Sequence, residues 1–134
     1  RGTGAGADAV GVRGRARPWS SFRAKGRLGP AEVGDLSAFR WPDGAWRGVP
    51  PQGQVRYEMH VGTCTPEGTW AAATAQLPAL ADLGITVIEM MPVAEFAGAF
   101  GWGYDGVDLY APTRLYGRPD DPRAFVELSY ALNI

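Results

Sequence analysis

The stretch from Val55 to Pro92, "VRYEMHVGTCTPEGTWAAATAQLPALADLGITVIEMMP", determines the expected fold. Its first seven residues alternate apolar and polar side chains, which is the period of a β-strand. Residues 69–84 repeat apolar side chains every three or four positions, as one face of a helix does. Residues 85–91 form a β-branched apolar run that Pro92 ends. The order strand, helix, strand predicts a right-handed βαβ unit with parallel strands.

Local signals place the ends of this helix. Thr69 is the predicted N-cap and Gly84 the predicted C-terminal stop. Pro78 lies inside the helical pattern, where it removes a backbone donor, so we expect a bend there. The apolar face of the helix consists of Trp70, Ala73, Leu77 and Leu80.

A glycine-rich aromatic stretch, "FGWGYDGVDLYAPTRLYG" at 100–117, follows the second strand. Residues 107–112 within it are predicted to be extended. A second helix is predicted over 120–134, with Asp121 as N-cap and Pro122 at the first helical position. Its apolar face consists of Phe125, Leu128 and Leu132.

Two parallel strands and two helices make a quarter of an eight-stranded barrel. The predicted fold class is therefore α/β, an incomplete (β/α)8 TIM barrel that comprises the first two β/α units over residues 55–134. A third strand would be expected where the chain stops, so we interpret the sequence as a truncated piece of a longer protein. Residues 18–54 are rich in proline and read as an irregular connector, and residues 1–17 are expected to be disordered because they hold little apolar surface.

Composition excludes several classes of function. The chain has 134 residues, 46% of them hydrophobic and 20% charged, with a net charge of -1, which gives no sign of nucleic-acid binding. No apolar run is long enough for a membrane span, and no signal peptide is recognised, so the expected location is cytoplasmic. Cys64 is the single cysteine and His60 the single histidine, too few ligands for a zinc site. No cofactor or metal is expected.

The loop after the second strand is the predicted functional region, because active sites of α/β barrels lie on loops at the carboxyl ends of strands. Aromatic faces stack on sugar C–H surfaces, and acidic or basic groups bond sugar hydroxyls. Trp102, Tyr104, Asp105 and Arg114 supply these groups. The competing interpretation, which we favour on the residues alone, is that the aromatic side chains simply cap the barrel.

Three carboxylates and the histidine are weaker candidates for catalytic residues. Glu89 lies in an apolar strand and needs a partner, which we expect to be an ion pair or loop amides. Glu58 and His60 share a strand face, and a structural role for His60 is favoured over a catalytic one. Glu89 and Glu95 are conceivable as an acid/base pair, although no distance follows from the sequence. Cys64 has no visible activating base, so a nucleophilic role is not expected.

Several stretches resemble the start of the catalytic barrel in the α-amylase superfamily, and within it most closely the malto-oligosyltrehalose trehalohydrolase family. They are "YEMHVGTCTPEGTW" (57–70), "LADLGITVIEMMPVAEF" (80–96) and "GWGYDGVDLYAPTRLYGRPDD" (101–121). "SAFRWPDGAWRGVP" (37–50) resembles the connector from an upstream β-sandwich domain. Branching enzymes share the general scheme. Cys64 departs from the family pattern, which usually has phenylalanine there.

The resemblance implies a retaining glycoside hydrolase that cleaves the α-1,4-glucosidic bond next to the trehalose end of maltooligosyl trehalose and releases trehalose. The implied substrate is that sugar or another α-1,4-glucan. The nucleophile and the acid/base would lie beyond Ile134, so the chain itself holds no catalytic residue and is expected to be inactive alone. The family pattern further implies that Tyr104 stacks on the glucose ring at the cleavage site with Trp102 beside it, while Asp105 braces the loop. The alternatives are a fragment of a 1,4-α-glucan branching enzyme, or a non-catalytic fragment that contacts sugar.

Overall fold

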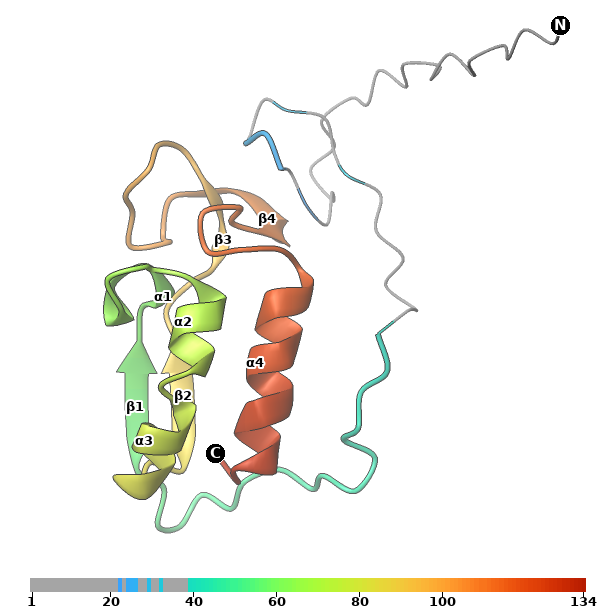
Figure 1. Ribbon diagram of the computed structural model, residues 1–134, viewed down its shortest axis with the longest axis vertical. Coiled ribbons are helices and arrows are strands. Elements are labelled where there is room, and N and C mark those ends of the chain that lie inside the picture. Colours follow the sequence, from blue (N-terminus) through green and yellow to red (C-terminus); the bar gives the residue numbers. More distant parts are fainter. Residues whose placement is uncertain (1–21, 23, 27–28, 30–31, 33–38) are drawn as a thin grey trace, which may run out of the picture.

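The computed structural model describes residues 22, 24–26, 29, 32 and 39–134 (Figure 1). The expected disorder of residues 1–17 lies outside the described residues, as does much of the N-terminal half of the connector. Within the described chain the elements follow in this order: β1 (Arg56–Met59), α1 (Val61–Cys64), α2 (Trp70–Thr74), α3 (Leu77–Asp82), β2 (Val87–Met90), β3 (Ala94–Phe96), β4 (Gly106–Pro112) and α4 (Asp120–Ala131).

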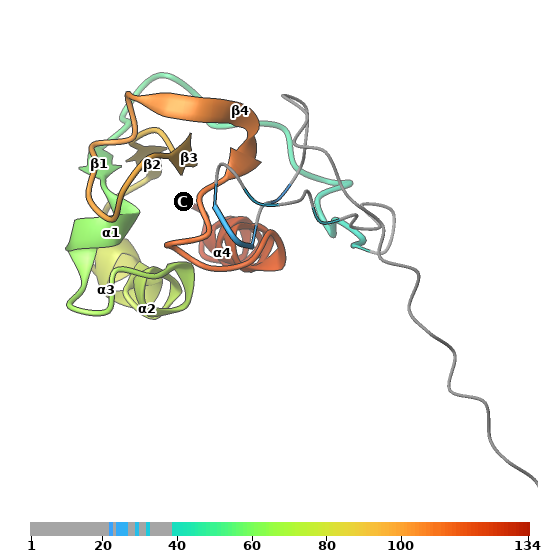
Figure 2. The ribbon, with the colours of Figure 1, turned by 90° about the horizontal axis from the view of Figure 1, so that it is seen from above.

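The predicted βαβ unit is confirmed. Strands β1 and β2 pair in parallel, with Met59 opposite Met90 in the register. The main-chain N–H of Met91 donates to the carbonyl of Met59 at 2.9 Å and continues the ladder. Figure 2 shows the pair on one side of the molecule and helices α2, α3 and α4 on the other. The helices therefore cover one face of the two strands.

The helix predicted over 69–84 is interrupted, as its proline suggested. Thr69 caps α2, because its hydroxyl oxygen accepts from the main-chain N–H of Ala72 at 3.3 Å. Pro78 lies in the first turn of α3, where no intrahelical donor is needed, so the backbone breaks just before it. Gly84 follows α3 with a φ of 90°, a left-handed conformation that ends the helix.

The core lies between the two strands and the helices. Trp70 from α2 meets Phe125 from α4 edge to face, with ring centroids 5.4 Å apart. Ala73 and Leu77 are completely buried. The buried members of this cluster are Met59, Val61, Trp70, Ala73, Leu77, Ile85, Phe96, Tyr116, Phe125 and Ile134. The apolar faces predicted from helical spacing are thus the faces that pack.

A second, antiparallel sheet follows β2 and consists of β3 and β4. The extended segment at 107–112 is confirmed within β4, whereas β3 was not predicted. Only three residues form β3, and one of them is the completely buried Glu95. Such a short run with a central carboxylate carries no strand signal in the sequence. Figure 1 shows the hairpin above the end of the molecule toward which β1 and β2 point.

Helix α4 begins slightly earlier than predicted. Its N-cap is Pro119, so the prediction of Asp121 as the cap is wrong. Asp121 lies in the first turn, and its carboxylate accepts from the main-chain N–H of Arg118 at 2.7 Å. Asp121, the second residue of the helix, therefore bonds the backbone just before the helix instead of capping the helix itself.

The described part of the connector, residues 39–54, contains no helix or strand. It nevertheless contacts the folded unit, because the ring of Trp46 stacks on Tyr130 of α4 at 4.9 Å and 22°. Phe22, further upstream, is buried, and the guanidinium of Arg118 lies 5.5 Å from its ring centroid. An irregular connector that packs on the folded unit agrees with its proline and tryptophan content; the domain boundaries themselves stay predictions.

Candidate functional site: an aromatic cleft at the strand ends

A cleft of about 640 Å³ opens at the carboxyl end of β1, between α1 and the loop that joins β3 to β4. This volume lies within the usual range of small-molecule sites. The cleft is lined by His60, Gly62, Thr63, Pro66, Glu67, Gly68, Phe96, Ala99, Phe100, Gly101, Trp102, Leu115 and Tyr116. Four aromatic side chains and one histidine thus converge on a half-open hollow at the end of the molecule where function was expected.

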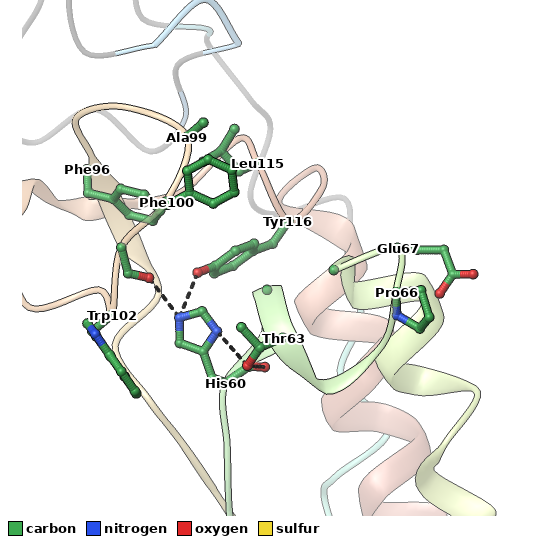
Figure 3. Close-up of a pocket in the computed structure, with 13 residues that line it drawn as sticks. His60, Thr63, Pro66, Glu67, Phe96, Ala99, Phe100, Trp102, Leu115 and Tyr116 are labelled. Atoms are coloured by element: carbon green, nitrogen blue, oxygen red, sulfur yellow. Dashed lines mark hydrogen bonds between the residues drawn. The ribbon is translucent and has the colours of Figure 1, made fainter.

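His60 lies in the middle of the residues that line the cleft (Figure 3). Its Nε2 lies 2.9 Å from the carbonyl oxygen of Gly101 and 3.2 Å from the hydroxyl of Tyr116. Its Nδ1 lies 3.3 Å from the hydroxyl of Thr63. Both ring nitrogens therefore have partners, which agrees with the structural role favoured for this histidine.

The loop at 97–105, here called the aromatic loop, carries the side chains predicted to bind sugar. Phe100 is 95% exposed, and Trp102 and Tyr104 are each 72% exposed. Large aromatic rings that are exposed together are common at binding surfaces and at interfaces with other parts of a protein. The aromatic side chains therefore do not cap a core within the described residues.

Glycine gives this loop its shape. Gly103 has a φ of 91°, and a Cβ atom there would collide with the carbonyl oxygen of Pro92. A Cβ on Gly101 would lie 3.0 Å from the Phe96 ring. The main chain can turn tightly against Pro92 only because position 103 lacks a side chain, and a side chain at position 101 would crowd the Phe96 ring. Close packing of the backbone thus requires glycine at position 103 and favours it at position 101.

The structure separates the three predicted site residues. The side chain of Trp102 lines the cleft, and its ring lies 6.2 Å from the ring of His60 at 71°. Tyr104 and Asp105 are exposed on the same loop but do not line this cleft. One carboxylate oxygen of Asp105 comes within 3.3 Å of the position that a Cβ on Gly101 would take. The bracing role of Asp105 stays a prediction.

Arg114 and Glu95 form an internal ion pair, so Arg114 does not face the cleft as a sugar ligand. The carboxylate of Glu95, which is fully buried, accepts from the guanidinium of Arg114. It also accepts from the main-chain N–H of Arg114 at 3.0 Å. A buried carboxylate with two such bonds holds the ends of the hairpin together. Glu95 is therefore occupied structurally and is a poor acid/base candidate.

Glu89 has a different environment from the one predicted. It pairs in register with Glu58 on β1, and both carboxylates are exposed to solvent. Within the described residues no ion pair reaches Glu89, so the expected partner is absent and its charge is hydrated. The suggested pair of Glu89 and Glu95 fails for the same reason, since one is hydrated and the other is held by Arg114.

Tyr116 belongs to the site although the sequence did not single it out. It is buried, contacts the edge of the His60 ring with centroids 5.8 Å apart, and lines the cleft. Burial raises its pKa above the ordinary value of 10.0, so the hydroxyl stays protonated near neutral pH. The one available signal was its place at the end of the glycine-aromatic stretch.

The remaining described groups that could take part in a reaction add no catalytic or metal-binding function to the cleft. Burial raises the pKa of the Cys64 thiol above 9.0, partly offset by a main-chain hydrogen bond, so the thiol is protonated and a poor nucleophile. In the described part of the chain, no three His, Cys, Asp or Glu side chains gather where they could hold a metal ion. No helix among the described residues has the length and apolar character to cross a bilayer. The cytoplasmic location stays a prediction.

Comparisons with known proteins agree with the resemblance seen in the sequence. Over 117 residues the chain is 48% identical to malto-oligosyltrehalose trehalohydrolase from Deinococcus radiodurans, a match that covers 87% of this chain and 20% of that protein. It is 38% identical over 104 residues to 1,4-alpha-glucan branching enzyme GlgB 2 from Streptomyces avermitilis, covering 72% of this chain and 18% of that protein. No protein-family model matches the chain.

A solved structure shares the fold. The crystal structure of a protein from Salmonella typhimurium described as an alpha amylase matches with a TM-score of 0.79 and 48% identity, covering 87% of this chain and 20% of that one. The fold and the cleft thus define a segment of an α-amylase-like protein. The chain belongs to the malto-oligosyltrehalose trehalohydrolase family of that superfamily. It spans about one fifth of the length of the curated relatives it matches.

Proposed function

We propose that this chain forms part of the substrate-binding end of a retaining α-glucan hydrolase. The reaction is cleavage of the α-1,4-glucosidic bond next to the trehalose end of maltooligosyl trehalose, with release of trehalose. The observation that carries the proposal is the 48% identity to the Deinococcus radiodurans trehalohydrolase over 117 residues, 87% of this chain. The two β/α units would then begin a (β/α)8 barrel.

Trp102 and Tyr104 are the proposed sugar-contacting residues, with Asp105 beside them. Their exposure supports this role, because an aromatic face must be free of protein contacts before a pyranose ring can stack on it. The cleft next to Trp102 adds a half-open space lined by a histidine and a tyrosine. The substrate would lie across the loop, with its apolar C–H faces against the rings.

The hydrolytic carboxylates are proposed to lie beyond Ile134. A retaining glycosidase needs a nucleophile and an acid/base about 5–5.5 Å apart, with the acid free to exchange its proton. Glu95 is held by Arg114 and does not meet this need. The matched relatives are about five times as long as the match, which leaves room for both groups elsewhere. We therefore expect no turnover from the 134-residue chain by itself.

The test is an activity assay on the full-length protein. Maltooligosyl trehalose and plain amylose are supplied in parallel, and the products are separated to detect free trehalose and new α-1,6 branches. Release of trehalose supports the proposal. Hydrolysis of plain amylose, which has no trehalose end, as fast as that of maltooligosyl trehalose would refute the proposed specificity.

A branching enzyme is the second candidate, favoured by the 38% identity to the Streptomyces avermitilis protein. It predicts transfer rather than hydrolysis, so α-1,6 branches would accumulate in amylose without a rise in reducing ends. A third possibility, that the chain only contacts sugar, predicts binding of maltooligosaccharide by the 134-residue chain with no turnover by the full-length protein.

A further inference from the structure

Within the described residues, a hydrogen bond from the side chain of His60, the residue that follows β1, joins the aromatic loop to the end of that strand. Gly101 in the loop is 41 residues after His60 in the chain, yet its carbonyl oxygen lies 2.9 Å from the imidazole Nε2. Gly101 immediately precedes Trp102, the predicted sugar-contacting residue that lines the cleft. The same imidazole meets the indole of Trp102 edge to face at 6.2 Å (Figure 3). One ring therefore touches both the main chain that carries Trp102 and the indole itself.

The partners of His60 determine where its hydrogen lies. A carbonyl oxygen can only accept, so Nε2 must carry hydrogen and donate to Gly101. The hydroxyl oxygen of Tyr116, 3.2 Å from Nε2, accepts from the same N–H as the second acceptor of a bifurcated hydrogen bond. At Nδ1 the hydroxyl of Thr63 can donate to a neutral imidazole, or accept from a charged one and pass its own hydrogen to the carbonyl of His60 at 3.4 Å. The bond to Gly101 thus survives in either protonation state.

We propose that His60 is the positioning residue of the aromatic loop, and that its Nε2–H fixes the main chain at Gly101 so that Trp102 faces the cleft. The effect on sugar binding rests on the proposed function, whereas the effect on the loop does not. His60 acts through Trp102 rather than on the sugar bond. Without this bond the loop keeps its glycine turns but loses its anchor at the end of β1, because no other hydrogen bond among the described residues joins the aromatic loop to β1 or to His60.

A matched pair of substitutions tests the position of the donor. In His60→Gln the side-chain amide nitrogen reaches the place of Nε2, so the bond to Gly101 is kept. In His60→Asn the amide reaches only the place of Nδ1, so the contact with Thr63 is kept and the bond to Gly101 is lost. Both variants remain polar and uncharged, which makes the reach of the donor the main difference between them.

Limited proteolysis of the full-length protein by chymotrypsin, without substrate, gives the first measurement, because the aromatic loop carries exposed Phe100, Trp102 and Tyr104 and cleavage follows the population of the locally opened loop. Cleavage within the loop should be about three- to tenfold faster in His60→Asn than in wild type, the factor expected from one net hydrogen bond. In His60→Gln it should stay within about twofold of wild type. Cleavage within α4 should not change in either variant. Equal cleavage of the loop in the two variants would overturn the assignment.

The second measurement is kinetic. A misplaced Trp102 weakens ground-state and transition-state binding alike, so His60→Asn should raise KM with kcat little changed, and His60→Gln should restore KM. If the full-length protein releases no trehalose, the proposed function fails, but the proteolysis result still decides the role of His60. Should His60→Asn not fold, His60→Met, similar in length to glutamine and without a donor, replaces it, and a loop protected as in wild type would refute the proposal.

Discussion

Replacing Arg114 by methionine should open the β3–β4 hairpin locally, because it leaves the buried carboxylate of Glu95 without its counter-charge. Removing one partner of a buried ion pair costs about 3–5 kcal/mol. We expect the lower end, about 3 kcal/mol, because the Arg114 side chain is 27% exposed and the main-chain N–H at position 114 still donates to the carboxylate. That free energy corresponds to about two powers of ten in the equilibrium for local opening.

Amide hydrogen exchange in the full-length protein measures this opening, because it reports the free energy of local unfolding residue by residue. The amides of β3 and β4 should exchange about a hundredfold faster in Arg114→Met. Arg123→Met is the matched control, since Arg123 pairs with Asp120 at 2.7 Å and that aspartate is 78% exposed. Loss of such a surface pair should cost less than about 1 kcal/mol.

A double variant isolates the buried charge. Glu95→Leu combined with Arg114→Met removes both partners, so the hairpin should be more stable than in Arg114→Met alone. The reasoning is refuted if Arg114→Met accelerates exchange no more than Arg123→Met does. It is also refuted if the double variant is less stable than Arg114→Met, because the cost would then lie in lost packing.

Three further predictions follow from the site and the fold. Trp102→Ala should weaken binding of maltooligosaccharide by the full-length protein about tenfold, as expected from the loss of one stacked ring. Val107→Ala, the control, should leave the affinity unchanged. Calorimetry measures both affinities, and equal values for the two variants would show that Trp102 does not bind the sugar. Tyr116, whose pKa is raised by burial, adds stability that is fully present below about pH 10 and is lost as the pH rises through its folded-state pKa, so Tyr116→Phe should flatten the alkaline loss of stability seen in thermal melts. The isolated 134-residue chain should show no sharp thermal transition, because a two-stranded sheet is rarely stable without a larger packed surface; a cooperative melt from a monodisperse monomer would contradict this.

Local sequence determined the elements that carry a strong period or a strong end signal. The alternation that begins at Val55 and the apolar run that ends at Met91 became the parallel pair. Thr69 and Gly84 ended the helix where they were expected to, and Pro78 interrupted it. These features depend on neighbours a few residues apart, so each is written in a short window of sequence.

Only the tertiary structure decided which side chains of the site meet. Glu95 looked like a possible acid and became the partner of Arg114, 19 residues away, because the short β3 folds back on β4. His60 was expected on the same strand face as Glu58, but β1 ends at Met59, and His60 became the anchor of Gly101, 41 residues away. Contacts of this kind depend on the path of a loop through space, and no periodicity in the sequence encodes that path. The sequence by itself determined the scaffold and the aromatic loop, whereas folding alone determined what holds that loop in place.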